Sequence, residues 1–130
     1  MGMRDIFGFG GAEPRLKGRD VAVIDVGSNS VRLVQFRVEG SVLWPVFNEK
    51  TMAGLGKGAP ETGRLNPEGV EAALRTLRRF TRLLDAKGVS TRGAVATAAV
   101  RECEDGPDFV ERVRQETGLV IDVLSGEEEG

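Results

Sequence analysis

The pattern of apolar and polar positions predicts three consecutive strands near the start of the chain. Val21 to Val26 is nearly all apolar, which is typical of a central strand covered on both faces. Gly27 to Ser30 has turn chemistry, and Val31 to Val38 then alternates as the second strand of a hairpin. After another turn, Val42 to Lys50 contains Pro45, which cannot donate a ladder hydrogen bond and so favours an edge strand. We expect these three strands to be antiparallel.

A glycine-rich loop and a long helix follow. The loop runs from Met52 to Arg64, and the helix begins with Asn66 as N-cap and Pro67 at its first position. Apolar side chains then recur every three or four residues until Gly88 ends the pattern: Val70, Ala73, Leu74, Leu77, Phe80 and Leu84. The opposite side of this helix is basic: Arg75, Arg78, Arg79 and Arg82. These arginines could bind nucleic acid, but a charged side opposite an apolar stripe is more often a solvated helix face.

The last part of the chain predicts a strand, a helix and a strand. Gly93 to Val100 is small and apolar, Pro107 to Thr117 is helical with Asp105 or Gly106 as its cap, and Leu119 to Leu124 is a strand. The order is therefore β-β-β-α-β-α-β. Since the later strands can join the sheet only through right-handed crossovers, we expect an α/β fold with a five-stranded mixed sheet and helices packed on it.

Length and charge set further bounds. At 130 residues the chain makes one domain, and its net charge of -2 gives no footprint for nucleic acid or an anionic membrane surface. No apolar run approaches the ~20 residues of a membrane helix, and the N-terminus lacks signal-peptide features. We expect residues 1–19 to form a flexible arm, residues 20–130 to fold, and the protein to be cytoplasmic. Cys103 has no second cysteine or histidine to partner it, which argues against a disulfide, a zinc site or a thiol nucleophile.

The segment from Asp25 to Ser30 is the best candidate for chemistry. Gly27 allows close approach of a ligand to the backbone, and Ser28, Asn29 and Ser30 add polar donors, which suits an oxyanion. An ordinary hairpin turn has the same composition. Asp25 favours a ligand site, because a carboxylate at the end of a doubly covered apolar strand is costly without a metal, a water network or a ligand.

Three segments resemble one known family. Ile24 to Leu33 (IDVGSNSVRL) looks like the first phosphate loop of the exopolyphosphatase and guanosine pentaphosphate phosphohydrolase family. Ala94 to Glu102 (AVATAAVRE) resembles its strand and Thr-x-x-x-Arg turn, and Gly118 to Glu129 (GLVIDVLSGEEE) resembles its strand and Ser-Gly-x-Glu-Glu segment. Three motifs in the right order are more specific than any one alone. The resemblance implies a ribonuclease-H-like half-domain of the actin-like ATPase superfamily.

The resemblance also implies roles for single residues. Asp25 would lie near magnesium or another divalent cation, and Glu129 would be the catalytic residue that activates the attacking water. For Glu129 the alternative is an acidic helix N-terminus, and for Arg101 it is a surface arginine paired with Glu102 or Glu104. The implied phosphate ligands are Gly27, Ser28, Asn29, Ser30, Arg32 and Arg101. Arginine suits this task because its planar, permanently charged group can donate two hydrogen bonds to one phosphate.

Two functions remain open after this comparison. The first is an enzyme that hydrolyses terminal phosphoanhydride bonds of polyphosphate or of guanosine pentaphosphate or tetraphosphate. The second is a non-catalytic binding module for polyphosphate or an alarmone. A sugar kinase of the same superfamily would need an ATP site and a sugar-binding acid that the sequence does not show. The resemblance allows a homodimer of the full-length protein, and it favours neither a membrane nor a specific nucleic-acid sequence as partner. The family's second phosphate loop has no match before Gly130, so we expect this fragment alone to be inactive.

Overall fold

The computed structural model describes residues 19–129, and the side chains of residues 19–127. The predicted arm therefore lies, except for Arg19, outside the described residues. Five strands form one sheet in the order β3-β2-β1-β4-β5: β1 (Asp20–Val26), β2 (Ser30–Glu39), β3 (Val42–Met52), β4 (Thr91–Ala96) and β5 (Ile121–Val123). The predicted five-stranded sheet with the first strand in its interior is confirmed.

Strand directions place several strand ends at one edge of the sheet. β1 pairs antiparallel with β2, and β2 pairs antiparallel with β3, whereas β4 is parallel to β1 and β5 is parallel to β4. The sheet is therefore mixed, as expected. The carboxyl ends of β1, β3, β4 and β5 all meet at the edge where the hairpin between β1 and β2 turns. β3 is an edge strand, which confirms the prediction from Pro45.

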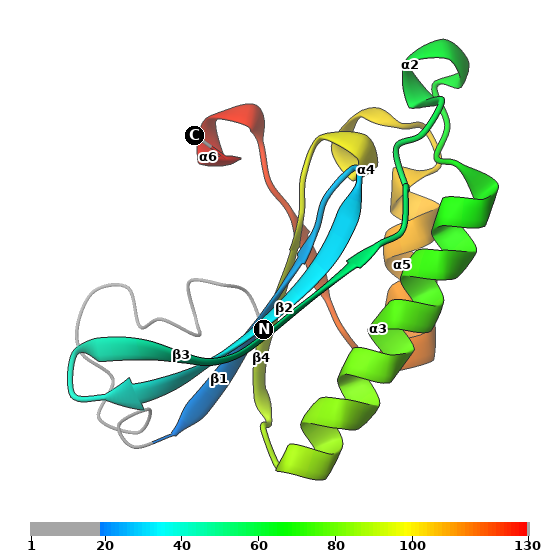
Figure 1. Cartoon of the computed structure of the whole chain (residues 1–130). Helices are drawn as coiled ribbons and strands as arrows, with labels where there is room; N and C mark the ends of the chain where they lie inside the picture. Colours follow the sequence, from blue (N-terminus) through cyan, green and yellow to red (C-terminus); the bar gives the residue numbers. More distant parts are fainter. Residues whose placement is uncertain (1–18, 130) are drawn as a thin grey trace.

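Two long helices cover one face of this sheet (Figure 1). They are α3 (Pro67–Lys87) and α5 (Gly106–Thr117), and three short helices lie in the connections: α2 (Ala59–Thr62), α4 (Ala98–Glu102) and α6 (Gly126–Glu129). The core between sheet and helices includes Ile24 and Leu33 from the sheet and Leu77, Phe80 and Val113 from the helices. The prediction that both long helices pack on the sheet is confirmed. No helix among the described residues is long and apolar enough to cross a membrane.

Two connecting segments contain short helices that the sequence did not predict. The strand expected over Gly93 to Val100 ends at Ala96, and the chain then turns into α4. Alanine is a strong helix former, and Val100 is buried within a helix. A short apolar run is compatible with either a strand or a helix, and here the prediction of a strand is wrong. The other difference is α2, which occupies part of the predicted loop between Met52 and Arg64.

The residues predicted as N-caps bind neighbouring loops. Asn66 and Asp105 do precede α3 and α5, but neither makes a side-chain cap hydrogen bond. The Asn66 side-chain amide donates to the Gly54 carbonyl at 3.2 Å, and the Asp105 carboxylate accepts from the Leu65 amide at 2.9 Å. Both side chains therefore fasten the segment between β3 and α3 onto the fold.

Two of the four arginines on the outer side of α3 form ion pairs with other elements of the fold. Arg79 pairs with Glu49 on β3, and Arg78 pairs with Glu116 on α5. Ion pairs with neighbouring elements are typical of a solvated helix face, and they leave less positive charge for a nucleic acid. The structure therefore favours the solvated-face interpretation of this helix.

The two faces of β1 are covered unequally. Ile24 and Val26 lie in the core under the helices, so Val23 and Asp25 point to the opposite face. The described long helices do not pack on this second face, the open face, on which Val21 is buried but Asp25 at the end of the strand is exposed. Burial of a carboxylate is therefore not an argument for a ligand at Asp25.

Candidate phosphate-binding site

The candidate site lies at the sheet edge where β1, β4 and β5 end. The segments that follow these strands are joined by backbone hydrogen bonds: Thr97 donates to Val26 at 3.2 Å, and Leu124 donates to Ala96 at 2.9 Å. The turn after β1, the helix α4 after β4 and the segment before α6 therefore lie next to one another. The structure thus brings together the three segments that carried the family resemblance.

The turn from Gly27 to Ser30 is held by its own backbone and by the loop after β3. The Gly27 amide donates to the Ser30 carbonyl at 2.9 Å. The Ser28 carbonyl accepts from Gly56 at 2.8 Å, and the Asn29 carbonyl accepts from the amides of residues 53 and 54 at 3.0 and 2.9 Å. Within the described residues, the amides of Ser28 and Asn29 donate to no backbone carbonyl. The carbonyls of this turn face the protein, and two amide donors remain for a ligand or for solvent.

Nothing in the backbone requires a glycine at residue 27. Its φ angle is not positive, and an added Cβ would meet only the Ser30 carbonyl oxygen, at 3.4 Å, which is ordinary van der Waals contact. Gly56 differs, because a Cβ there would lie 3.0 Å from the Ser28 Cβ and 3.2 Å from the Ala99 Cβ. Gly56 is therefore needed where the loop, the turn and α4 come together.

Asp25 and Arg32 are direct neighbours on the open face of the sheet. They are partners in the register of β1 and β2, and both side chains are exposed. Since Val31 and Leu33 are buried under the helices, Arg32 points to the same face as Asp25. The carboxylate and the guanidinium can therefore act on one ligand bound at the sheet edge.

Arg101 reaches the same edge from α4. Its Nη1 donates to the carbonyl of Leu124 at 3.0 Å, and its Nη2 lies 3.3 Å from Glu102 Oε1. The Glu102 pair is the alternative that the sequence left open, and it is present. The Arg101 side chain is 26% exposed and that of Glu102 is 69% exposed, so solvent weakens this ion pair. A phosphate could replace Glu102 while the bond to Leu124 keeps the guanidinium in position.

Glu129 lies in α6, directly after the segment that Arg101 contacts. The backbone of α6 spans Gly126–Glu129, but the side chains of Glu128 and Glu129 are outside those described. Figure 1 shows α6 at the same edge of the sheet as α4. The catalytic role of Glu129 stays a prediction.

The described residues offer a divalent cation few ligands from the protein. No group of three or more acidic, cysteine or histidine side chains that could hold a metal occurs within the described part of the chain. Asp25 is a single carboxylate beside the candidate phosphate turn. Magnesium is commonly bound by one or two carboxylates together with substrate phosphates and waters, and this donor set fits that mode.

Cys103 has the properties of a structural residue. It is buried, and burial raises the pKa of its thiol, with the nearby carboxylates of Asp105 and Glu102 raising it further. Since the thiolate is the reactive form, a raised pKa makes Cys103 a poor nucleophile. This agrees with the sequence argument.

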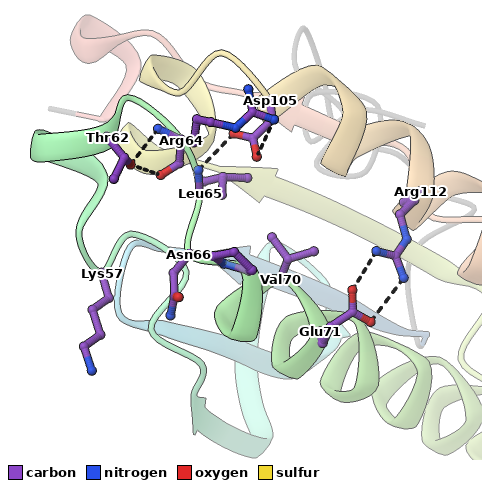
Figure 2. A pocket seen from close by; sticks show the side chains of 10 residues that line it. Lys57, Thr62, Arg64, Leu65, Asn66, Val70, Glu71, Asp105 and Arg112 are labelled. Atoms are coloured by element: carbon purple, nitrogen blue, oxygen red, sulfur yellow. Dashed lines mark hydrogen bonds and ion pairs between the residues drawn. The ribbon is translucent and has the colours of Figure 1, made fainter.

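A pocket of about 520 Å³ opens on the other side of the loop after β3, near the start of α3 (Figure 2). Its charged groups are mostly paired within the chain: Arg64 with Glu104 at 3.1 Å, and Arg112 with Glu71 at 2.7 Å. Lys57 points away from these pairs in Figure 2. The pocket is therefore a structural junction between the loop, α3 and α5.

Sequence reasoning missed the part played by the loop after β3. The amides of residues 53, 54 and 56 fix the candidate turn, although they lie more than twenty residues away along the chain. The clustered glycines were the only available signal, because they allow close backbone approach. Which turn they approach depends on strand pairing that a local pattern does not contain.

The fold is an α/β domain with a candidate phosphate site at one edge of its sheet, and comparison with known proteins identifies the family. Residues 33–130 match the model of the Ppx/GppA phosphatase family. Exopolyphosphatase 1 of Mycobacterium tuberculosis is 32% identical over 110 residues, covering 84% of this chain and 32% of that protein. The chain belongs to the Ppx/GppA phosphatase family.

Solved structures agree with this assignment. The Ppx/GppA family member of Aquifex aeolicus superposes with a TM-score of 0.82 at 37% identity, covering 86% of this chain and 37% of that one. An exopolyphosphatase from Cytophaga hutchinsonii gives a TM-score of 0.79 at 30% identity, covering 84% and 35% of the two chains. The predicted α/β fold with a five-stranded mixed sheet is therefore the fold of solved members of this family. The chain spans about a third of the length of the curated relatives that it matches.

Proposed function

We propose that this chain is the N-terminal part of a phosphohydrolase that removes terminal phosphate from a phosphoanhydride chain. Relatives named exopolyphosphatase favour inorganic polyphosphate as the substrate, with guanosine pentaphosphate as the alternative. The observation that carries the proposal is the turn after β1, where the carbonyls of Ser28 and Asn29 accept hydrogen bonds from the loop after β3, while the amides of these two residues donate to no backbone carbonyl within residues 19–129. Adjacent backbone amides in such a turn form an anion site.

Each proposed ligand has a distinct task. Gly27, Ser28, Asn29 and Ser30 bind the terminal phosphate through backbone and side-chain donors, and the room left by the missing Cβ of Gly27 admits it. Arg32 and Arg101 approach from β2 and α4 and balance the charge on the phosphate oxygens. Glu129 would hold and deprotonate the water that attacks the phosphorus.

A divalent cation, with magnesium as the first choice, would be held by Asp25 together with phosphate oxygens of the substrate. When bound, it would supply positive charge to the oxygens that become more negative during the reaction. Asp25 would orient this charge toward the turn, because it ends the strand that leads into Gly27.

Three further expectations go with this function. The 130 residues alone should bind phosphate weakly without releasing it from polyphosphate, because one turn supplies only one side of a phosphate clamp. A cytoplasmic location and the boundary of the folded part at residue 20 also stay predictions.

The proposal is tested by replacing the water-activating residue in the full-length protein. Glu129→Gln keeps the size and removes the basicity, so turnover of polyphosphate should fall by about 10²- to 10⁴-fold with little change in substrate affinity. Glu128→Gln is the matched control on the same helix. Release of orthophosphate measured at several polyphosphate concentrations gives both parameters. Near-normal turnover of Glu129→Gln, or a larger loss in Glu128→Gln, would overturn the assignment.

A further inference from the structure

A second cation stands next to Arg32 on the open face of the sheet. Lys50 on β3 is the direct partner of Arg32 in the register of β2 and β3, as Asp25 is in the register of β1 and β2. Asp25, Arg32 and Lys50 therefore form one row across three strands, at right angles to the strands. The row lies next to the candidate phosphate turn, because Ser30 and Met52 are paired two residues further along.

The side chain of Lys50 points to the same face as Arg32. Its neighbours Glu49 and Thr51 both contact Arg79 of α3, so they lie on the helix-covered face. Successive side chains of a strand alternate between faces, which places Lys50 on the opposite, open face. Lys50 and Arg32 are both exposed.

The row contains two cations, Arg32 and Lys50, and one carboxylate, Asp25, so its net charge is positive. Neither Arg32 nor Lys50 makes a hydrogen bond or an ion pair with a described residue, whereas most other arginines of the fold have an acidic partner. Directly opposed cross-strand side chains have Cβ atoms about 4.5–5.5 Å apart, and like charges there destabilise the sheet. A bound anion would remove this repulsion.

We propose that Lys50 and Arg32 form a subsite for the next phosphate of a linear oligophosphate whose terminal phosphate sits in the turn from Gly27 to Ser30. The inference rests on the proposed function and deepens it, because it extends the contact from one phosphate to at least two. Lysine suits this position, since its ammonium group is a mobile point charge on a long stem that can follow a flexible chain. The ligand class is a run of linked phosphates, from inorganic polyphosphate or from a nucleotide that carries such a run.

The test compares a ligand of one phosphate with a ligand of three. Orthophosphate and inorganic tripolyphosphate are titrated into the 130-residue chain, and amide chemical shifts at the turn report binding. Lys50→Gln should weaken tripolyphosphate binding about tenfold and leave orthophosphate binding within about twofold, because only the longer ligand reaches residue 50. Arg32→Gln should weaken tripolyphosphate binding at least as much.

A matched control separates the subsite from general charge. Arg82→Gln makes the same change in charge at an exposed arginine of α3, on the opposite side of the sheet from Lys50, and it should bind both ligands as the unmodified chain does. Guanosine pentaphosphate forms a third arm, where Lys50→Gln should cause a similar loss if the contact is to phosphate.

Each outcome decides the inference. Equal affinity of Lys50→Gln and the unmodified chain for tripolyphosphate, with orthophosphate still bound at the turn, overturns the subsite and leaves the proposed function intact. Equal losses in Lys50→Gln and Arg82→Gln also overturn it, because the effect would then be net charge alone. If the unmodified chain binds neither phosphate ligand, the turn fails as a phosphate site and the subsite fails with it.

Discussion

The amide of Gly56 donates a 2.8 Å hydrogen bond to the carbonyl of Ser28. The two residues are also closely packed: a Cβ added at Gly56 would lie 3.0 Å from the Ser28 Cβ and 3.3 Å from its hydroxyl oxygen. The loop after β3 thereby holds the candidate phosphate turn through the carbonyl side of its backbone. Contacts this close leave little room for adjustment, because Ala99 of α4 lies on the other side.

We expect Gly56→Ala to destabilise the fold and to displace the turn. The added methyl group must push Ser28 or Ala99 aside, and overpacking of this kind costs about 1–3 kcal/mol of unfolding free energy. Urea denaturation measures the loss. Gly126→Ala is the control, because an added Cβ there meets nothing within 4 Å and its stability should be unchanged or slightly raised. Equal stability of the Gly56→Ala variant and the unmodified chain would show that the loop moves freely.

Unlike Gly56→Ala, the Gly27→Ala variant should keep its stability but lose phosphate binding. An alanine Cβ at residue 27 makes only ordinary contact with the Ser30 carbonyl, so unfolding free energy should stay within about 0.5 kcal/mol. The same methyl group would occupy the space through which a phosphate reaches the amides of the turn. Orthophosphate titration followed by amide chemical shifts, together with urea denaturation, separates the two effects. Unchanged phosphate affinity would remove Gly27 from the binding site.

The sequence predicted those elements whose limits are set by local chemistry. Pro67 begins α3, and Gly88, with a φ of 73°, ends it, as the pattern indicated. Pro45 lies on an edge strand for the reason given by its missing amide donor. Helix α4 was missed, because a five-residue apolar helix directly after a strand has no period of its own that a local pattern could reveal.

The sequence predicted which residues form the candidate site, but not which contacts from other elements hold them in place. The composition of the turn indicates an anion site by itself, the family resemblance adds Arg32 and Arg101, and the structure brings all three to one edge. The support of Ser28 by Gly56 and the position of Lys50 beside Arg32 both arise from pairing between strands, which depends on the whole sheet. The exposure of Asp25 was misjudged for a similar reason, since a run of apolar residues does not tell how many faces the helices cover.

Stability should fall in acid partly through Asp20. Its carboxylate accepts hydrogen bonds from Arg37 Nε at 3.0 Å and Gln35 Nε2 at 2.6 Å, and the Arg37 bond above all lowers the pKa of Asp20 below its usual 3.8. Because the pKa of Asp20 is lower in the folded than in the unfolded chain, ionised Asp20 stabilises the fold fully at pH values above its unfolded pKa, near 4. This stabilisation is lost as the pH falls through the pKa of Asp20 in the folded chain. The Arg37 side chain is half exposed, so solvent weakens this ion pair and the contribution of Asp20 to stability is small.

Asp20→Asn isolates this contribution from the other carboxylates. Urea denaturation of the variant and the unmodified chain at pH 6 and pH 3 gives two differences in unfolding free energy. The variant should be less stable at pH 6, and the gap should narrow at pH 3 because Asp20 is then increasingly protonated in the unmodified chain. A gap of the same size at both pH values would mean that the charge of Asp20 does not stabilise the fold.

Arg101 offers a test of the phosphate site that does not depend on the turn. Its guanidinium is held by the Leu124 carbonyl at 3.0 Å and by the more exposed Glu102 at 3.3 Å. If Arg101 meets the phosphate both before and during reaction, Arg101→Ala in the full-length protein should lower both substrate affinity and turnover, with kcat/KM reduced about 10²-fold or more. Arg101→Lys should recover only part of this, because an ammonium group cannot contact Leu124 and a phosphate in the same planar arrangement.

The Glu102→Gln variant helps to separate a catalytic role of Arg101 from a structural one. It removes the competing carboxylate and keeps Arg101, so substrate affinity should stay the same or rise slightly. Steady-state release of orthophosphate from polyphosphate gives kcat and KM for the three variants, and thermal unfolding checks that the loss of the Leu124 contact has not unfolded Arg101→Ala. If a folded Arg101→Ala variant keeps more than about half of kcat/KM, the guanidinium serves only to join α4 to the end of β5.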